Sequence, residues 1–374
     1  MKKISVSLLV SLSALLLGCE TNYYQTTVEA PPATVSSDAG CGSATAAAPD
    51  AGTNAAAPDA EAAAAIDTGS VVAPSGMETL LLNVQGLTLV GGLNKRLVFV
   101  KTSGGYNAET YGGEVSVYDL RDGSSRVVTK NGAGPAVNED GLAAWAEIDV
   151  GNRCATIMTE AWGKIMDNCD GTDKVLPQLT QISYRGQQVL FTIKSNSGTG
   201  AYQNALYQWD GAKRLLIARA PDDDVLLPTI QGDEFGFMRF YAPPSGKNSD
   251  AVIMNMSDGS NVFTVVGNLP TDSIVGFAFN KLWFAYTMEA ADGSQRSWLQ
   301  GRQNNGVMDF PAGYPILNDE GTIVLWGITG VIRYYAIGTP FSGTITGYDS
   351  IYLEGNDLFY ISKGQLFVYH IQTK

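Results

Sequence analysis

Histidine is almost absent from this chain, which has one among 374 residues. A single imidazole excludes sites that need two of them, and it argues against Ser-His-Asp or Cys-His catalysis. Basic residues are also scarce, with 24 Lys and Arg against 37 Asp and Glu and a formal charge of −13. This acidity argues against a nucleic-acid partner, which requires a basic face. Apolar residues make up 45% of the chain, which is ample for a sizeable core.

The N-terminus has the features of an export signal. A positive start at residues 1–3 precedes the uncharged apolar run 4–17, which leads into Leu16-Leu17-Gly18-Cys19. The run is too short to cross a bilayer as a mature helix, which takes ~20 residues. The tetrapeptide resembles the lipobox of bacterial lipoproteins. An ordinary signal peptide followed by an incidental cysteine is the alternative.

The lipobox resemblance implies that residues 1–18 are a signal peptide and that Cys19 carries diacylglycerol and a further acyl chain such as palmitate. Three acyl chains exceed the two signals that stable membrane anchoring requires. In this family an Asp after the cysteine often retains the protein in the inner membrane, whereas this chain has Glu20. We therefore expect a lipid-anchored protein of the outer membrane, on the periplasmic side or at the cell surface.

Residues 19–76 form a predicted tether. Beyond Cys19 they contain seven acids, no Lys or Arg, and mostly Ala, Pro, Thr, Ser and Gly, and the segment 46–51 recurs at 55–60. Too few large apolar side chains are present to offset the entropy of ordering. The segment is therefore expected to be a disordered spacer with an end-to-end distance of roughly 40–45 Å. An Ala-rich helix at 60–66 would be too short to stand alone.

From Met77 onward the sequence repeats short apolar runs. Each run follows a turn, and the runs begin at residues 97, 142, 189, 235, 282, 322 and 358, spaced by 45, 47, 46, 47, 40 and 36. A second set of turns lies downstream, with Asp-Gly at 122, 170, 210 and 258 and Asn-Gly at 305. These dipeptides supply the positive φ of tight hairpins. Four turn-linked strands at a period of ~45 residues indicate a β-propeller blade.

The sequence therefore predicts an all-β domain over residues 77–374, a β-propeller of seven blades with four strands each. The blades are expected to begin near residues 87, 135, 177, 227, 274, 314 and 348. The last blade has room for three strands, so the spare strand 77–84 is expected to close the ring on its edge. A β-sandwich or a solenoid fits the spacing less well. Six or eight blades remain alternatives, because the last two units are short.

The succession of an inner strand, an Asp-Gly turn and an aromatic second strand resembles TolB-like and WD40-like propellers of the bacterial envelope. The Trp-Asp dipeptide occurs once, at Trp209-Asp210, and the Asp-box of sialidases is absent. The resemblance therefore implies an architecture and little about activity.

Cysteine and histidine are candidates for structural roles. Cys154 and Cys169 lie in the second unit of an exported chain, so we expect a disulfide between them, worth ~3 kcal/mol for a loop of this size. Cys41 is left over in the tether, where it either pairs between chains or stays a free thiol. His370 lies in the last apolar strand, where a packing or surface role is expected.

One face of the predicted ring is the candidate interaction site. The loops 101–114, 194–204 and 241–250 are expected to emerge on it, beside an acidic run between the third and fourth units. Tyrosine among small polar residues makes an adaptable recognition surface. A protein partner, a glycan or a divalent cation would fit such a face. The candidate residues are Tyr106, Tyr111, Tyr202, Tyr241, Asp222, Asp223 and Asp224.

The sequence predicts no catalytic, cofactor or metal site. The run 166–171 ends in a suitably placed Gly for a calcium loop, but Met166 stands where that loop needs an Asp. We expect a membrane-tethered, non-enzymatic scaffold that binds an envelope protein through its propeller loops. A glycan-binding or glycan-cleaving propeller is one alternative, and cleavage would require paired carboxylates. A cell-surface adhesin is another, and the sequence leaves enzymatic activity open.

Overall fold

The computed structural model describes the part of the chain that follows the predicted tether. The described residues are 78–101, 112–149, 151–152, 154–167, 169, 181–196, 202–217, 224–241, 249–266, 272–303, 306–310, 312–328, 330–339 and 342–373. Every regular element in these ranges is a β-strand, which confirms the all-β class. The signal peptide, Cys19, Cys41 and the tether lie outside the described residues.

The strands form antiparallel sheets in chain order. A seven-stranded sheet holds β2 (Leu87–Leu93), β3 (Arg96–Lys101), β4 (Gly113–Asp119), β5 (Ser125–Val137), β6 (Ala143–Asp149), β7 (Cys154–Thr159) and β8 (Gly163–Asp167). The next four-stranded sheet holds β9 (Ile182–Arg185), β10 (Gln188–Asn196), β11 (Tyr202–Trp209) and β12 (Lys213–Ile217). It is followed by a sheet of β13 (Asp224–Gln231), β14 (Glu234–Phe240), β15 (Ser249–Asn255) and β16 (Asn261–Val266).

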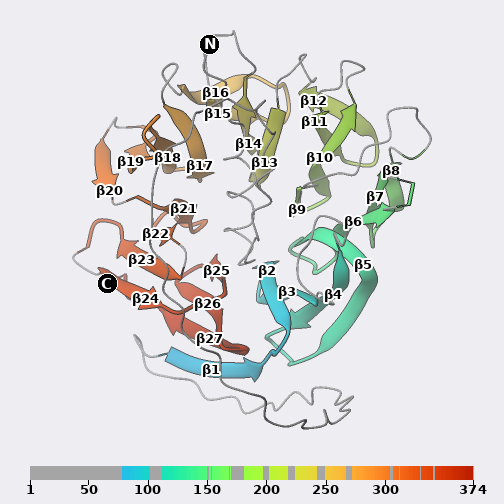
Figure 1. The fold of residues 1–374 in the computed structure, drawn as a ribbon, viewed down its shortest axis with the longest axis horizontal. Helices are drawn as coiled ribbons and strands as arrows, with labels where there is room; N and C mark the ends of the chain where they lie inside the picture. The colour runs from blue at the N-terminus through green and yellow to red at the C-terminus, as the bar shows by residue number, and fades with distance from the viewer. Residues whose placement is uncertain are drawn as a thin grey trace, which may run out of the picture.

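The C-terminal half continues the same order. One sheet holds β17 (Ser273–Phe279), β18 (Trp283–Glu289), β19 (Gln295–Gly301) and β20 (Val307–Phe310). Another holds β21 (Tyr314–Leu317), β22 (Ile323–Ile328), β23 (Val331–Ala336) and β24 (Ser342–Thr346). The last holds β25 (Ser350–Glu354), β26 (Asp357–Ser362), β27 (Gln365–His370) and, from the other end of the chain, β1 (Glu78–Asn83). Figure 1 shows the sheets arranged around a centre, as blades of a propeller.

Strand β5 is 13 residues long and takes part in two strand pairings. Its first part pairs with β4, where Tyr118 lies opposite Ser125. Its last part pairs with β6, where Val137 lies opposite Ala143. The strand thus runs from the outer edge of one four-stranded group to the inner edge of the next, which is why the first seven strands form one continuous sheet.

The N-terminal strand completes the last sheet, as the sequence predicted for segment 77–84. Strand β1 is antiparallel to β27, and Leu80 lies opposite Phe367. Leu82 is 5% exposed and packs in a cluster with Phe359 and Leu366. The two ends of the described chain therefore meet in one sheet (Figure 1), which covers an otherwise open strand edge.

Neighbouring sheets pack face to face through large apolar side chains. Successive side chains of a strand point to opposite faces. In β10, Leu190 packs in a cluster with Phe235 of β14, whereas Phe191 packs in another cluster with Ile157 of β7. Burial on both faces explains why the second strand of each unit reads as a continuous apolar run rather than an alternating one.

The turns between first and second strands meet at one end of the ring, which we call the turn face. Asn138, Asn280 and Asn318 repeat one arrangement there. Each side-chain oxygen accepts hydrogen bonds from backbone N–H groups of its own turn, at 2.8 to 3.1 Å. Each Nδ2 donates to a carbonyl in the corresponding turn of the next sheet, at 2.8 to 3.1 Å. These side chains satisfy buried polar groups and also join adjacent sheets.

Candidate functional site

The predicted interaction residues are only partly within the described structure. Tyr106, Tyr111, Asp222 and Asp223 lie outside the described residues. The backbone places Tyr202 at the start of β11, opposite Asn196, and Asp224 at the start of β13, opposite Phe240. Strands β11 and β13 are in contact. These two candidates therefore lie at the corresponding ends of adjacent sheets.

Tyr241 follows directly after β14 and so lies beside the Asp224–Phe240 pair. Its hydroxyl donates a hydrogen bond to the Asp250 carboxylate, and the Arg239 guanidinium lies 5.8 Å from the centre of its ring. Burial, together with this hydrogen bond and the charge of Asp250, raises the pKa of Tyr241 to about 12. The hydroxyl therefore stays protonated and holds the end of the sheet together, while the half-buried ring remains partly open to solvent.

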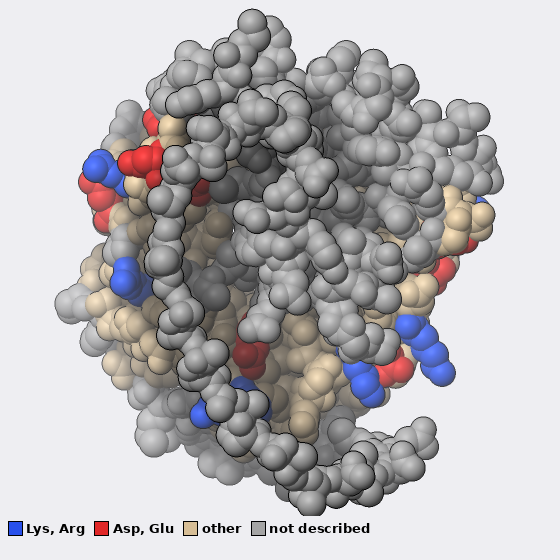
Figure 2. All heavy atoms as spheres, in the orientation of Figure 1, with Lys and Arg blue, Asp and Glu red and all other residues tan. Residues whose placement is uncertain are grey.

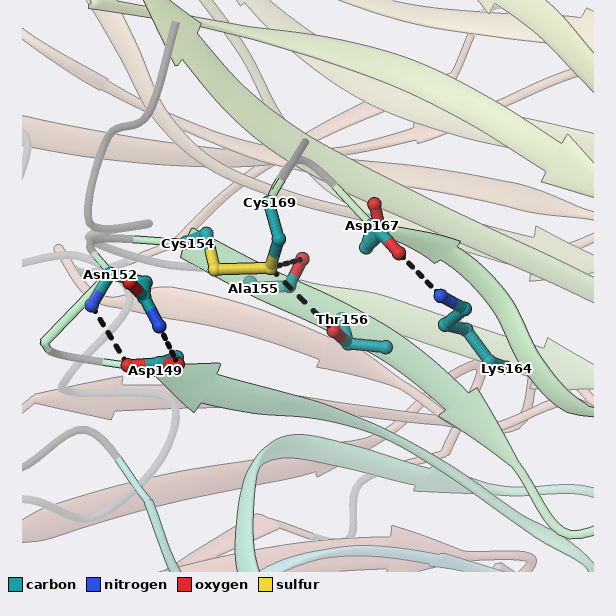
Figure 3. Close-up of a disulfide and its surroundings, with 8 residues drawn as sticks. All are labelled: Asp149, Asn152, Cys154, Ala155, Thr156, Lys164, Asp167 and Cys169. Atoms are coloured by element: carbon teal, nitrogen blue, oxygen red, sulfur yellow. Dashed lines mark hydrogen bonds and ion pairs between the residues drawn. A yellow bond between two sulfur atoms is a disulfide. The ribbon is translucent and has the colours of Figure 1, made fainter. Parts of the chain in front are cut away.

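The predicted disulfide is present. Cys154 begins β7, Cys169 follows β8, and their Cα atoms are 5.0 Å apart. Figure 3 shows the bond beside Thr156, with the Lys164–Asp167 ion pair of 2.7 Å nearby on β8. The bond ties the end of the β7–β8 hairpin and fits the structural role expected from the sequence.

A polar cleft lies at the ends of strands β3, β4 and β5. It has a volume of about 390 Å³ and is also lined by residues of the β4–β5, β5–β6 and β7–β8 turns. Most of its lining residues are charged or polar, and two are large and apolar. The lining residues are Arg96, Val117, Asp119, Ser124, Arg126, Asp140, Gly141, Leu142 and Glu160.

Arg96 forms one wall of the cleft. Its Nε lies 3.2 Å from Asp119 Oδ2, and its Nη1 donates to the Glu139 carbonyl at 2.5 Å. The guanidinium lies against Gly141, where an added Cβ would come within 2.5 Å of the Arg96 Cδ and Nε atoms. Gly141 also has φ +83°, which disfavours any other residue. Because Gly141 has no side chain, the Arg96 guanidinium can occupy this position.

Arg126 forms the opposite wall. Its guanidinium makes a two-point ion pair with Glu160, and its Nη2 also donates to the Gly141 carbonyl at 2.6 Å. Glu160 Oε2 in turn accepts a hydrogen bond of 2.7 Å from the Ala143 amide. Both arginines therefore hold the 139–141 turn by its carbonyl groups and are themselves held by carboxylates.

The environment of Asp119 favours its ionised form. Hydrogen bonds from Arg121 and the charges of Arg121 and Arg96 hold the pKa of Asp119 well below its ordinary value. A general acid needs the opposite, a raised pKa. The cleft therefore offers fixed charges and hydrogen-bonding groups at a rigid wall. Sequence reasoning missed it because the two arginines come together only when β3 and β5 both pair with β4. The one available signal in the sequence was Arg96, a charged residue at the start of the apolar strand β3.

A second charged group lies across the turn face. Arg185, at the end of β9, pairs with Asp319 in the β21–β22 turn at 3.1 Å. Gln231 Nε2 donates to the same carboxylate at 2.9 Å, and Glu139 lies 3.8 Å from Arg185. Residues from four separate turns thus converge, and they link sheets that are not neighbours in the ring.

The remaining expectations concern metals and membranes. Within the described ranges, no three His, Cys, Asp or Glu side chains gather as metal ligands would. The same ranges contain no helix with the length and apolarity to cross a membrane.

His370 is half exposed and lies 2.8 Å from Asp357, at a surface position as the sequence suggested. Figure 2 shows the described acidic and basic side chains in small mixed groups, without a large patch of one sign in this view.

No protein-family model matches the chain, and no curated protein matches its sequence. Solved structures resemble it in fold. An oligogalacturonate lyase from Vibrio parahaemolyticus has a TM-score of 0.51 at 8% identity, over 74% of this chain and 87% of that one. The β-propeller domain of the trilobed protease from Pyrococcus furiosus has a TM-score of 0.50 at 10% identity, over 75% and 93%.

A third similar structure is TolB from Acinetobacter baumannii, with a TM-score of 0.32 at 17% identity over 58% of this chain and 54% of that one. That overlap is too loose to support an argument. Of the first two likenesses, the one to a β-propeller domain bears out the propeller fold expected from the ~45-residue repeat. At 8% and 10% identity they concern the fold alone.

Proposed function

We propose that this chain is a lipid-anchored protein of the outer membrane whose propeller is a non-enzymatic docking scaffold for another envelope protein. The lipobox-like Leu16-Leu17-Gly18-Cys19 and the charged, Ala- and Pro-rich tether support the anchoring. A ring of sheets whose two ends are joined by β1 and β27 supports a rigid scaffold. Loops on a rigid ring are suited to holding a partner in a fixed orientation.

The observation that carries the proposal is the state of the cleft carboxylates. Asp119 and Glu160 each accept charge-assisted hydrogen bonds from an arginine. Carboxylates held in this way stabilise the local structure. The rigid polar groups around them remain available for a partner to contact. The half-buried ring of Tyr241 supports a second contact area at the opposite ends of the strands.

We also infer that the ring has seven blades. Five sheets have four strands, and the seven-stranded sheet accounts for two more blades if β5 serves both. The change of pairing partner within β5, from β4 to β6, supports this count. The predicted blade starts near 87, 227, 274, 314 and 348 lie within three residues of the starts of β2, β13, β17, β21 and β25. The predicted start at 135 falls in the part of β5 that pairs with β6, and the one at 177 precedes β9 by five residues.

Crosslinking in intact cells, followed by affinity purification of the tagged full chain and mass spectrometry, tests the scaffold. The triple variant Tyr106/Tyr202/Tyr241→Ala probes the loops, and Arg126→Gln probes the cleft. Arg214→Gln is the matched control, because Arg214 is an exposed arginine with a carboxylate partner, Asp210, outside the cleft. We expect one specific envelope protein with the wild type and the control, and its loss with at least one probe. Recovery of the same proteins by every variant would exclude these faces.

Glycan binding or cleavage is the second candidate, because a solved oligogalacturonate lyase resembles this chain in fold. A glycan array probed with the purified protein separates this function from protein docking. Protease treatment of intact cells then distinguishes a surface adhesin from a periplasmic scaffold, since only the former is cleaved.

A further inference from the structure

The outer part of the β17–β20 sheet carries a row of side chains that the proposed scaffold does not use. Trp298 of β19 lies between Tyr286 of β18 and Asp309 of the edge strand β20, and it is directly opposite each of them in the strand register. Directly opposite residues of antiparallel strands point to the same face of the sheet. The three side chains therefore lie next to one another, and β20 is at the outer rim of the ring (Figure 1).

The row faces the β13–β16 sheet and extends beyond the core between the two sheets. Tyr286 packs against that apolar core, in which the rings of Phe263 and Phe284 have their centroids 5.1 Å apart. Among the described residues, Trp298 is not part of this cluster; it is partly exposed, and Asp309 is exposed. The apolar core therefore ends before Trp298, and the indole borders solvent.

The Trp298 indole is held in place by Tyr286. The two ring centroids are 5.3 Å apart and the ring planes differ by 24°, which is a stacked arrangement. The tyrosine therefore covers one face of the indole, and the other face lies on the side of the edge strand, where the opposing side chain is the short carboxylate of Asp309. The face of an aromatic ring carries partial negative charge, so it attracts the C–H groups of a ligand.

Polar groups surround the indole on the same face of the sheet. Arg296 and Gln300 lie two positions to either side of Trp298 on β19, at ~7 Å along the strand. Asp309 lies one strand spacing away, at ~4.8 Å. In the part of the chain that the structure describes, the side chains of Arg296, Gln300 and Asp309 make no hydrogen bond or ion pair. Donors and acceptors beside the ring are therefore available to a ligand.

We propose that this row and its polar neighbours bind a neutral hexopyranose unit of a glycan. We call the site the rim platform, and its residues are Tyr286, Arg296, Trp298, Gln300 and Asp309. The inference goes beyond protein docking, and it gives the glycan-binding alternative a position on the molecule. A hexopyranose has a face of C–H groups, which fits the indole, and hydroxyl groups around its edge, which fit the polar side chains.

The hydroxyl groups of the sugar have partners of both kinds on the rim platform. The Asp309 carboxylate accepts hydrogen bonds, whereas the Arg296 guanidinium and the Gln300 amide donate them. Burial and the charge of Asp309 raise the pKa of Tyr286, so its hydroxyl stays protonated at neutral pH and is a further donor. One positive and one negative group flank the ring, which favours a ligand without net charge.

The same features disfavour a protein partner at this position. The centre of a protein interface is depleted of charged residues. Here Arg296 and Asp309 lie immediately beside the aromatic ring, and both are exposed. The rim platform also belongs to a different sheet from the Arg96–Arg126 cleft, so its ligand does not compete with a partner bound there.

Saturation-transfer NMR with the purified full chain tests the rim platform, because it detects weak binding through the C–H protons of the sugar itself. The probes are three neutral oligosaccharides: cellohexaose, maltohexaose and mannohexaose. We expect the wild type to bind at least one of them. Trp298→Ala should weaken that binding by about 10-fold, since it removes the ring on which the sugar stacks.

Trp162→Ala is the matched control. Trp162 is also partly exposed and lies beside a tyrosine, with its ring centroid 6.2 Å from that of Tyr184, but it belongs to the seven-stranded sheet. We expect this variant to bind the sugar as the wild type does. Equal weakening in Trp162→Ala and Trp298→Ala would contradict a site at the rim.

Two further variants keep the test decisive if Trp298→Ala does not fold. Asp309→Ala and Gln300→Ala remove polar groups that are not buried, and each should weaken binding by about 3-fold through a lost hydrogen bond. Absence of saturation transfer to all three sugars in the wild type overturns the proposal. Undiminished binding in every platform variant also overturns it, and then glycan binding itself persists at another site. Neither result bears on the envelope partner sought by crosslinking, so the two proposals can fail separately.

Discussion

Gly141 is the residue on which the cleft most directly depends. Its φ of +83° and the position of Arg96 leave no room for a side chain. We expect Gly141→Ala to lower the free energy of unfolding by about 2 kcal/mol, through backbone strain and displacement of the arginine. Urea denaturation measures this. Gly91→Ala is the control, because an added Cβ there meets nothing within 4 Å, and an equal loss in both variants would contradict the explanation.

Asp119 makes stability depend on pH in a predictable direction. Arg121 and Arg96 hold its pKa below its ordinary value in the folded chain. A group with a lowered folded pKa stabilises above its unfolded pKa of about 4, and this contribution is lost as the pH falls through the folded pKa. We therefore expect the urea midpoint to fall more steeply below pH 4 in the wild type than in Asp119→Asn. Asp309→Asn, an exposed acid on β20, should keep the wild-type slope.

Asn318 shows how one side chain joins two turns. Its Nδ2 donates to Thr322 Oγ1 at 2.9 Å and to the Gly355 carbonyl at 3.1 Å, and the residue is 1% exposed. Asn318→Asp keeps the accepting oxygen but loses both donated bonds and places a carboxylate beside a carbonyl. We expect a loss of about 2 kcal/mol and a fall in melting temperature of about 5 °C. Circular dichroism measures it, and the exposed Asn261→Asp should leave the melting temperature unchanged.

Strand β1 is the element that joins the chain ends, and its two leucines allow a matched comparison. Leu82 is 5% exposed in the core of the last sheet, whereas Leu80 is 49% exposed on the same strand. We expect Leu82→Ala to cost about 3 kcal/mol, the usual effect of emptying a buried leucine site. Leu80→Ala should cost less than about 0.5 kcal/mol. Equal effects in chemical denaturation would mean that β1 does not pack as the structure shows.

The Arg185–Asp319 pair acts on the whole molecule, because its partners belong to sheets far apart in the ring. Their side chains are 27% and 49% exposed, so solvent weakens the attraction. A double-mutant cycle of Arg185→Gln and Asp319→Asn should give a coupling energy of about 0.5–1 kcal/mol. If the losses in unfolding free energy of the two single variants simply add in the double variant, the Arg185–Asp319 pair does not stabilise the ring.

Local patterns predicted much of this architecture. Apolar runs beginning near 97, 235 and 358 marked second strands, since a sheet buried on both faces needs large side chains at consecutive positions. The unpaired run 77–84 predicted the strand that closes the last sheet, because an open apolar edge requires a partner. The disulfide followed from two cysteines at hairpin spacing. Such features depend on neighbouring residues and therefore appear in the sequence.

The contacts that join the ring could not be predicted in this way. Nothing near Arg185 in the sequence indicates Asp319, and nothing near Lys95 indicates Glu354 or Asp357. Only the radial packing of the sheets brings these turns together, because it places residues more than 130 positions apart within hydrogen-bonding distance. The sequence by itself determined the strands, their period and the closing strand, since these follow from side-chain alternation and turn chemistry. Only the tertiary structure decided the cleft, the Arg185–Asp319 ion pair and the contacts of Lys95 with the last sheet, because charge pairing depends on distance in space.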